Sequence, residues 1–221
     1  MIKILIIADD FTGALDTGVK FAAKGAKTKV MTKWNDDFVN DPAEVLVLCV
    51  PTRHETPEDA YEMVRAVVEK ADGKVGTIFK KTDSVLRGNV GAELTAVLEG
   101  SEANQLYFIP ALPSMRRITL GGIHYISGIA VKNSVFGRDP FDPVTESYVP
   151  DLMHKQSDAH IESVSVEEAI STAPTTKTRR SMFMTVKAAT RWMPSSRRSA
   201  SGACRGWSPD VPAWQKLWLP E

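Results

Sequence analysis

Cysteine and histidine are scarce in this chain of 221 residues, and long apolar runs are absent from its sequence. One of its two cysteines, Cys49, lies inside an apolar stretch, so we expect a buried thiol rather than a disulfide. The four histidines do not have the spacing of metal ligands, so the sequence predicts no metal site. No apolar run approaches the roughly 20 residues of a membrane-spanning helix, and the first residues do not resemble a signal peptide. These absences favour a cytoplasmic protein that does not interact with membranes.

An excess of one charge is also missing from the whole chain, since 27 Lys and Arg balance 27 Asp and Glu. The balance is uneven along the sequence, because residues 172–221 contain nine basic and two acidic residues. Four of the five tryptophans lie in the same stretch, at Trp192, Trp207, Trp214 and Trp218. The chain is long enough for one sizeable core with an appendage. The change of composition therefore predicts an α/β domain over residues 1–172 and an irregular, basic, Trp-rich tail over residues 173–221.

Short apolar runs alternate with helical patterns in the first part of the chain. Strands are expected over residues 4–8, 28–33, 45–50, 76–80 and 106–109, and helices over residues 14–24, 57–71 and 90–98. Strands that alternate with helices predict right-handed crossovers and an open, mainly parallel sheet with helices on both faces. Glycines and alternating residues over 118–131 then predict a hairpin-rich extension, and a further helix is expected to open at 149–153.

Two adjacent carboxylates, Asp9 and Asp10, follow the first expected strand and precede a helix. In open parallel sheets, ligands bind at the carboxyl ends of the strands, so this pair is a candidate for part of a ligand-binding site. Either Asp10 or Thr12 is expected to cap the helix. The alternative is that these residues are caps and turn formers without further function.

A second polar segment, KKTDSVLRGN over residues 80–89, lies between an expected strand and helix. It therefore reaches the same edge of the sheet as Asp9 and Asp10. Its cations, carboxylate, hydroxyls and amide suit a small anionic ligand with several hydroxyl groups. The alternative is an ordinary solvated loop. A third segment, PALPSMRR over residues 110–117, also follows a strand but indicates little by itself.

The ordered set of motifs resembles the amino-terminal domain of the four-carbon acid sugar kinases. The resemblance covers roughly residues 1–168. It rests on ADDFTGALDTG, KKTDSVLRGN, the PALP segment with its arginine, and GGIHYISGIAVKNSVFGRDPFDPVTESYV. It implies an ATP-dependent kinase that uses a divalent metal, Mg²⁺, and phosphorylates acids such as threonate or erythronate at the terminal hydroxyl. It also implies that this domain holds the small anionic sugar acid, whereas a carboxyl-terminal domain supplies most of the nucleotide site.

The same resemblance implies roles for individual residues. Asp9 and Asp10 are implied as the catalytic pair. The substrate-binding residues are implied to be Thr12, Lys81, Asp83, Ser84, Arg87, Asn89 and Arg117, and Asp139 matches the acid of the later D-P pair. One departure is Arg116, which stands where the family has a glycine, so the turn there is in question. The sequence also contains no GxxxxGK[ST] run, and we expect the carboxyl-terminal nucleotide domain to be missing.

The tail resembles a family sequence read in the wrong frame. Back-translation of MFMTVK (residues 182–187), shifted by two nucleotides, permits V-Y-D-G-K, which is typical of the family at this point. The same shift over residues 208–219 permits a second family-like string, A-G-C-A-G-L-A-E-A-L-A. Because both strings come from one frame in the correct order, we expect a frameshifted segment whose tryptophans do not pack into the core. Its removal is then expected to leave the melting temperature of the domain unchanged or higher. The alternative is a basic, disordered tail or an arm that binds nucleic acid. The absence of helical or strand periodicity in the segment favours the frameshift.

Two other functions are compatible with parts of the pattern. A receiver-type phosphoacceptor also has an acidic pair after its first strand, but it needs an aspartate at the end of the central strand, where this chain has Cys49-Val50-Pro51. A non-catalytic fragment that binds sugar acids requires nothing beyond the residues that are present. The kinase domain and the binding fragment therefore remain the leading interpretations.

Overall fold

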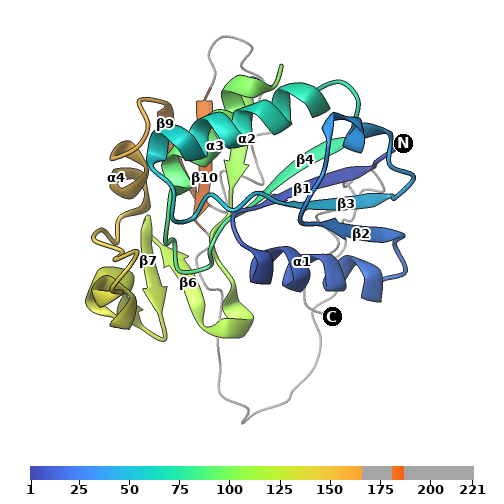
Figure 1. Ribbon diagram of the computed structural model, residues 1–221. Helices are drawn as coiled ribbons and strands as arrows, with labels where there is room; N and C mark the ends of the chain where they lie inside the picture. The colour runs from blue at the N-terminus through green and yellow to red at the C-terminus, as the bar shows by residue number, and fades with distance from the viewer. Residues whose placement is uncertain (166–180, 187–221) are drawn as a thin grey trace, which may run out of the picture. The chain divides into compact units, whose positions relative to one another are not determined.

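The strand β1 (Ile4–Ala8) lies inside a parallel sheet, as the sequence predicts (Figure 1). The computed structural model describes residues 1–165 and 181–186. The strands of this main sheet have the order β2-β3-β1-β4 and pair in parallel, with bounds Thr28–Met31 for β2, Val45–Cys49 for β3 and Thr77–Lys81 for β4. Since β3 and β4 flank β1, the segments that follow these three strands meet at one edge of the sheet.

Side chains of β1 alternate between the two faces of the main sheet. Leu5 and Ile7 pack with α2 and α3, whereas Ile6 and Ala8 pack with α1 on the opposite face. Figure 1 shows α1 on one side of the sheet and α2 with α3 on the other. The helix bounds are Phe11–Ala23 for α1, Pro57–Ala71 for α2 and Val90–Gly100 for α3. Helices on both faces of the sheet are therefore confirmed, and burial of each large side chain of β1 contributes roughly 1.5–3 kcal/mol.

The helix α1 begins earlier than the sequence pattern predicts, at Phe11 rather than at Ala14. Asp10 is its N-cap, and Asp10 Oδ1 accepts a hydrogen bond of 2.7 Å from the backbone N–H of Gly13. A Cβ atom at Gly13 would lie 2.6 Å from the same oxygen, so the cap requires glycine at this position. Gly13 therefore belongs to the first turn of the helix.

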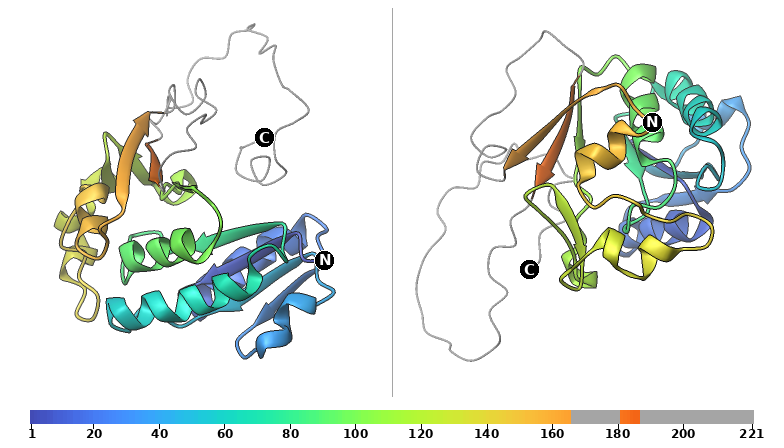
Figure 2. Two further views of the ribbon diagram at one scale, coloured as in Figure 1. Left: turned by 90° about the horizontal axis from the view of Figure 1, so that it is seen from above. Right: turned by 90° about the vertical axis from the view of Figure 1, so that its left-hand side faces the viewer.

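The strand β5 (Gln105–Phe108) corrects one sequence-based expectation. The run 106–109 was expected to add a buried strand to the main sheet, but β5 belongs to a separate parallel sheet of order β5-β10-β9. The views of Figure 2 show β9 (His160–Ser165) beside β10 (Ser181–Val186). The strand that pairs with β5 is β10, which lies much later in the chain, and no local pattern in the sequence predicts this pairing.

The hairpin-rich extension is confirmed. Strands β6 (Arg117–Leu120) and β7 (Ile123–Ile126) pair antiparallel, and the short β8 (Ile129–Ala130) continues the meander. The turn before β6 places Arg116 in the left-handed region, with φ of 55°. This conformation is strained for a residue with a side chain, which explains why glycine suits the position better. The helix α4 (Val149–His154) follows at its expected place, and its Val149 and Met153 are buried.

The predicted tail over residues 173–221 lies largely outside the described residues, and so do its four tryptophans. Six of its residues are described, and they form β10, which pairs with β5 and β9. The expectation of an irregular segment therefore does not hold for residues 181–186. The boundary near residue 172 remains a prediction. The described residues all lie in one compact unit.

Candidate functional site

The carboxylates after β1 are held by an arginine that follows β3. Arg53 donates from Nε (2.9 Å) and Nη2 (2.7 Å) to Oδ2 of Asp9, and from Nη1 (2.7 Å) to Oδ2 of Asp10. Its Nη2 also lies 3.9 Å from Oδ1 of Asp83, in the loop after β4. The guanidinium is largely buried, and the charge of Asp9 raises the pKa of Arg53 against the opposing effect of burial. Arg53 thus joins the segments that follow the strands β1, β3 and β4.

Asp9 and Asp10 differ in what their oxygens do. Both oxygens of Asp10 are engaged, Oδ1 by the backbone of Gly13 and Oδ2 by Arg53. Asp9 is 2% exposed, and its Oδ1 has no hydrogen-bond partner within residues 1–164, whose side chains the structure describes. A buried acceptor without a donor is rare in native proteins and calls for an explanation such as a water or a ligand. The unpaired acceptor therefore distinguishes Asp9 from Asp10, whose two oxygens both accept hydrogen bonds.

Lys81, the last residue of β4, brings a positive charge to the same cluster. Its Nζ lies 3.5 Å from the point where a Cβ of Gly13 would stand, next to the N-terminus of α1, and it donates to the carbonyl of Thr82. Burial lowers the pKa of Lys81, while the charges of Asp9, Asp83 and Asp10 partly oppose this effect. Lys81 thus lies within electrostatic range of all three carboxylates and brings a positive charge into the cluster.

Asp83 and Arg87 form the second wall of the cluster. Arg87 Nε donates to Oδ2 of Asp83 (2.9 Å), and Nη1 donates to Oδ2 of Asp139 (3.3 Å) from a later loop. The guanidinium also lies 5.6 Å from the ring centroid of Phe136, within the range of a cation–π interaction. Burial alone raises the pKa of Asp83, but the hydrogen bond from Arg87 and the charge of Arg53 outweigh it, so the pKa is lowered. Both carboxylates of this wall are therefore held ionised beside a fixed arginine.

The hairpin supports this loop from the side of Ser84. Arg117 Nη1 donates to Ser84 Oγ, and the ring of His124 lies 3.0 Å from the carbonyl oxygen of Ser84 through Nε2. The other ring nitrogen, Nδ1, lies 3.0 Å from the hydroxyl of Thr119. Burial lowers the pKa of His124, so the neutral ring is favoured, with Nε2–H donating to Ser84. Among the described side chains, Arg117 Nε is buried without a partner.

Two expected site residues do not join the cluster through their side chains. Thr12 is exposed on the first turn of α1, where it lines a shallow apolar groove with Phe11 and Leu15. Asn89 is buried, and its Nδ2 donates to the carbonyls of Thr52 (2.9 Å) and Glu55 (2.8 Å). Asn89 therefore holds the loop that contains Arg53, and both of its amide hydrogens are used for this purpose.

Arg53 is the residue that sequence reasoning missed. The sequence predicts a strand over residues 45–50, but it gives no role to Arg53, which lies in the segment after that strand. The order β3-β1-β4 places that segment directly beside Asp9 and Asp10. A cation within a few residues of the end of a strand adjacent to the acidic pair is the signal that would have identified Arg53.

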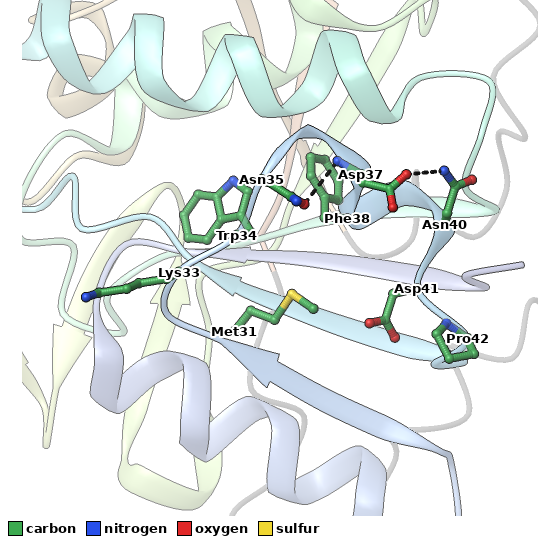
Figure 3. Close-up of a pocket in the computed structure, with 9 residues that line it drawn as sticks. All are labelled: Met31, Lys33, Trp34, Asn35, Asp37, Phe38, Asn40, Asp41 and Pro42. Atoms are coloured by element: carbon green, nitrogen blue, oxygen red, sulfur yellow. Dashed lines mark hydrogen bonds between the residues drawn. The ribbon is translucent and has the colours of Figure 1, made fainter.

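A separate surface pocket of about 550 Å³ lies between β2 and the short helix η1 (Asp36–Asn40), as Figure 3 shows. Its polar groups are engaged locally, since Asn40 donates to Asp37 and Lys29 pairs with Asp41. The pocket contains no member of the cluster, being lined among the described residues by Met31, Lys33, Trp34, Asn35, Asp37, Phe38, Asn40, Asp41 and Pro42. We therefore assign the site to the cluster around Arg53.

The described part of the chain offers no group of three His, Cys, Asp or Glu side chains that could hold a metal ion. The carboxylates of the cluster face Arg53 and Arg87 instead, so their geometry suits a neutral or acidic organic ligand better than a bare cation. In the same ranges, the structure has no helix with both the length and the apolar character needed to cross a bilayer.

Fold and site together define an α/β domain with a cluster of charged side chains at the carboxyl edge of a parallel sheet, the edge at which ligands bind in folds of this kind. The chain belongs to the family described as the sugar-binding N-terminal domain, whose sequence profile matches residues 4–191. The resemblance inferred from the motifs is thereby confirmed.

Similar proteins support this assignment. The chain is 33% identical over 168 residues to the D-threonate kinase of Salmonella typhimurium, a match that covers 75% of this chain and 40% of the relative. It is 36% identical over 161 residues to the D-erythronate kinase of Heliobacterium modesticaldum, covering 71% of this chain and 37% of the relative. A crystal structure from Bordetella bronchiseptica, a domain-swapped dimer with bound citrate, superposes with a TM-score of 0.68 at 29% identity, covering 82% of this chain and 46% of that one. The chain thus spans about 40% of the length of these curated relatives.

Proposed function

We propose that this chain is the sugar-acid-binding part of an ATP-dependent kinase that phosphorylates four-carbon acid sugars, of the threonate or erythronate type, on the terminal hydroxyl. The observation that carries the proposal is the buried Oδ1 of Asp9, an acceptor without a donor inside a cluster that also contains Lys81 and Arg53. A hydroxyl of the ligand would donate a hydrogen bond to Oδ1 of Asp9, and the carboxylate of the ligand would pair with a cation of the cluster. The names of the relatives are consistent with this ligand class.

The residues of the cluster divide into two roles under this proposal. Lys81 and Arg87 hold the carboxylate of the sugar acid, Lys81 as a point charge and Arg87 through its planar guanidinium. Asp9 would accept a hydrogen bond from the hydroxyl that is to be phosphorylated, and it would be the base that takes the proton of that hydroxyl when the phosphoryl group moves to it from ATP and ADP leaves. Asp10 and Arg53 orient Asp9, because the cap on α1 fixes Asp10 and Arg53 joins the two carboxylates.

The proposal includes ATP and Mg²⁺ because the relatives are named as kinases. The described residues of this chain give no support for either group. ATP would supply the phosphoryl group, and Mg²⁺ would neutralise its charge during transfer. The described residues do not fit either group, since the aspartates already face arginines and no set of metal ligands is present among them. We therefore place the nucleotide site outside the described residues.

A second candidate is a fragment that binds sugar acids without phosphorylating them. It requires only the residues of the cluster around Arg53, and the chain spans 40% and 37% of the two kinases named above. Incubation of the purified chain with ATP, Mg²⁺ and each sugar acid separates the candidates. Formation of ADP that depends on the sugar acid identifies a kinase, whereas binding without ADP formation identifies the fragment.

The proposal also includes the frameshift inferred for the tail. The matches of both shifted strings to the family support it. Sequencing the DNA across codons 165–221 tests it directly. A nucleotide sequence whose shifted frame reads V-Y-D-G-K supports the frameshift, and stop codons in that frame reject it.

A further inference from the structure

A buried polar trio lies next to the candidate site, on the side of α3. Lys80 Nζ lies 3.0 Å from Oε2 of Glu93, and both side chains are 2% exposed. Thr52, which is 0% exposed, donates its hydroxyl to the other oxygen of Glu93, Oε1. Each oxygen of this one carboxylate thus accepts a hydrogen bond from a different strand end.

The trio joins the two segments that carry the cations of the site. Thr52 directly precedes Arg53 in the loop after β3, and Lys80 directly precedes Lys81 at the end of β4. Lys80 Nζ also donates to the backbone carbonyl of Lys81 (3.1 Å). Because successive strand residues point to opposite faces, Lys80 turns toward α3 while Lys81 turns toward α1. A shift of Glu93 would therefore move Thr52 and Lys80, and with them Arg53 and Lys81, which are the next residues in the chain.

A second set of contacts holds the loop on the other side of Arg53. Asn89 donates to the carbonyls of Thr52 and Glu55, which flank Arg53 in the sequence. Gly88, with φ of +81°, approaches so closely that a Cβ there would lie 3.0 Å from Cγ of Arg53 and 3.1 Å from its carbonyl oxygen. The backbone of Arg53 is thus fixed by α3 and by the segment before it, while its guanidinium reaches the carboxylates.

The trio is not accounted for by stability alone. A buried ion pair is often replaced by apolar residues without loss of stability, because the cost of removing two charges from water offsets their attraction. Its position between the ends of β3 and β4 suggests that it orients side chains of the site instead. We infer that Glu93 is a positioning residue, which, together with Lys80 and Thr52, sets the positions of Arg53 and Lys81 relative to Asp9. The inference rests on the proposed binding of a sugar acid at this cluster.

The test uses the full chain and compares Thr52→Val with Thr95→Val. Both replace a buried threonine by a residue of the same shape, but Thr95 bonds to Gly91 and Ser157, away from Arg53. Glu93→Gln removes the charge at the centre of the trio, and exposed Glu62→Gln is its control. Thr52→Ser keeps the hydroxyl and should behave as the wild type. If Glu93→Gln fails to fold, the milder Thr52→Val decides.

Two measurements are made on each variant. Calorimetry with D-threonate and D-erythronate should show binding weakened roughly tenfold to a hundredfold in Thr52→Val and Glu93→Gln, since small displacements at a site have effects of this size. NMR of the Nε–H group of Arg53 should show a changed shift and faster hydrogen exchange in the same variants. Thr95→Val and Glu62→Gln should keep wild-type affinity and the wild-type Arg53 signal, whatever their melting temperatures.

The two measurements separate the inference from the proposed function. Wild-type affinity and an unchanged Arg53 signal in folded Thr52→Val would overturn the positioning role. If Thr95→Val weakened binding as much as Thr52→Val, the effect would be one of general stability and the inference would also fail. If the wild type bound neither acid, the proposed function would fail, and the Nε signal of Arg53 would still decide whether the trio positions this side chain.

Discussion

Arg53 donates two hydrogen bonds to one oxygen of Asp9, from Nε at 2.9 Å and from Nη2 at 2.7 Å, both to Oδ2. The other oxygen of Asp9, Oδ1, is buried and lacks a partner among the residues whose side chains are described. A single arginine thus fixes the carboxylate while leaving one acceptor open. The contact between Arg53 and Asp9, at the carboxyl edge of the main sheet, is the basis of the ligand binding proposed above.

Removal of the arginine tests how much the cluster depends on it. Arg53→Ala leaves two buried or half-buried carboxylates without their cation, so we expect the free energy of unfolding to fall by about 3–5 kcal/mol. Urea unfolding measures this change. Arg65→Ala is the control, because Arg65 forms an exposed pair with Glu69 and its loss should cost only about 0.5 kcal/mol. Equal losses of unfolding free energy in Arg53→Ala and Arg65→Ala would show that the cluster does not depend on Arg53 for its stability.

The charge of Lys81 should matter for acidic ligands alone. Lys81→Met keeps most of the side chain but removes the cation, and we expect the binding of D-threonate to weaken by roughly 2–5 kcal/mol. The neutral alcohol D-threitol should bind equally to the wild type and the variant, and exposed Lys70→Met should bind like the wild type. Arg87→Ala should also weaken binding, but it leaves Asp83 and Asp139 unpaired, so Lys81 gives the cleaner result. Undiminished binding of D-threonate by Lys81→Met would remove this residue from the site.

His124 predicts a pH dependence of stability. Burial lowers the pKa of His124, the carbonyl of Ser84 opposes this effect, and the charge of Arg117 adds to it. Because the pKa is lower in the folded state than the roughly 6.5 of an unfolded histidine, the unfolded state binds the proton more readily. The stability is then complete above about pH 6.5 and falls at lower pH, by at most about 1.4 kcal/mol per pH unit. The loss ends below the folded-state pKa.

Urea unfolding between pH 7.5 and 5 measures this dependence. The wild type should lose stability over this range, and His124→Gln should lose less, whereas exposed His154→Gln should follow the wild type. The charged groups that act on His124 in the folded protein are Arg117 and Asp83. Parallel curves for all three proteins would contradict the assignment.

The strand β10 predicts where the chain can be shortened. The described residues lie in one compact unit, and within it β10 lies between β5 and β9. A chain that ends at residue 189 should keep the melting temperature of the full chain, whereas one that ends at residue 180 should melt lower because β5 and β9 lose their shared partner. This prediction replaces the expectation from the sequence alone that removal of the whole tail leaves the melting temperature unchanged or higher. Calorimetry of the two truncated chains measures the difference. Equal melting temperatures would show that β10 contributes nothing to the fold.

Much of this arrangement follows from the sequence, since the apolar runs that become β1, β3 and β4 predict buried parallel strands. Asp9, Asp10, Lys81 and Arg87 were found because polar residues at strand ends meet at one edge. Arg53 was missed because its importance depends on β3 being the neighbour of β1, and strand order is a tertiary property. The pairing of β5 with β10 could not be predicted for the same reason, because the two strands are some 70 residues apart along the chain.

The account predicts different roles for the adjacent aspartates, and isothermal titration with D-threonate and D-erythronate tests this most directly. The wild type should bind at least one of the two acids. Asp9→Asn should weaken that binding about tenfold or more, because a charged acceptor for the ligand hydroxyl is lost. Asp10→Asn keeps a capping side chain and should retain most of the affinity. If the wild type binds neither acid, or if Asp9→Asn binds as tightly as the wild type, the proposed site is contradicted.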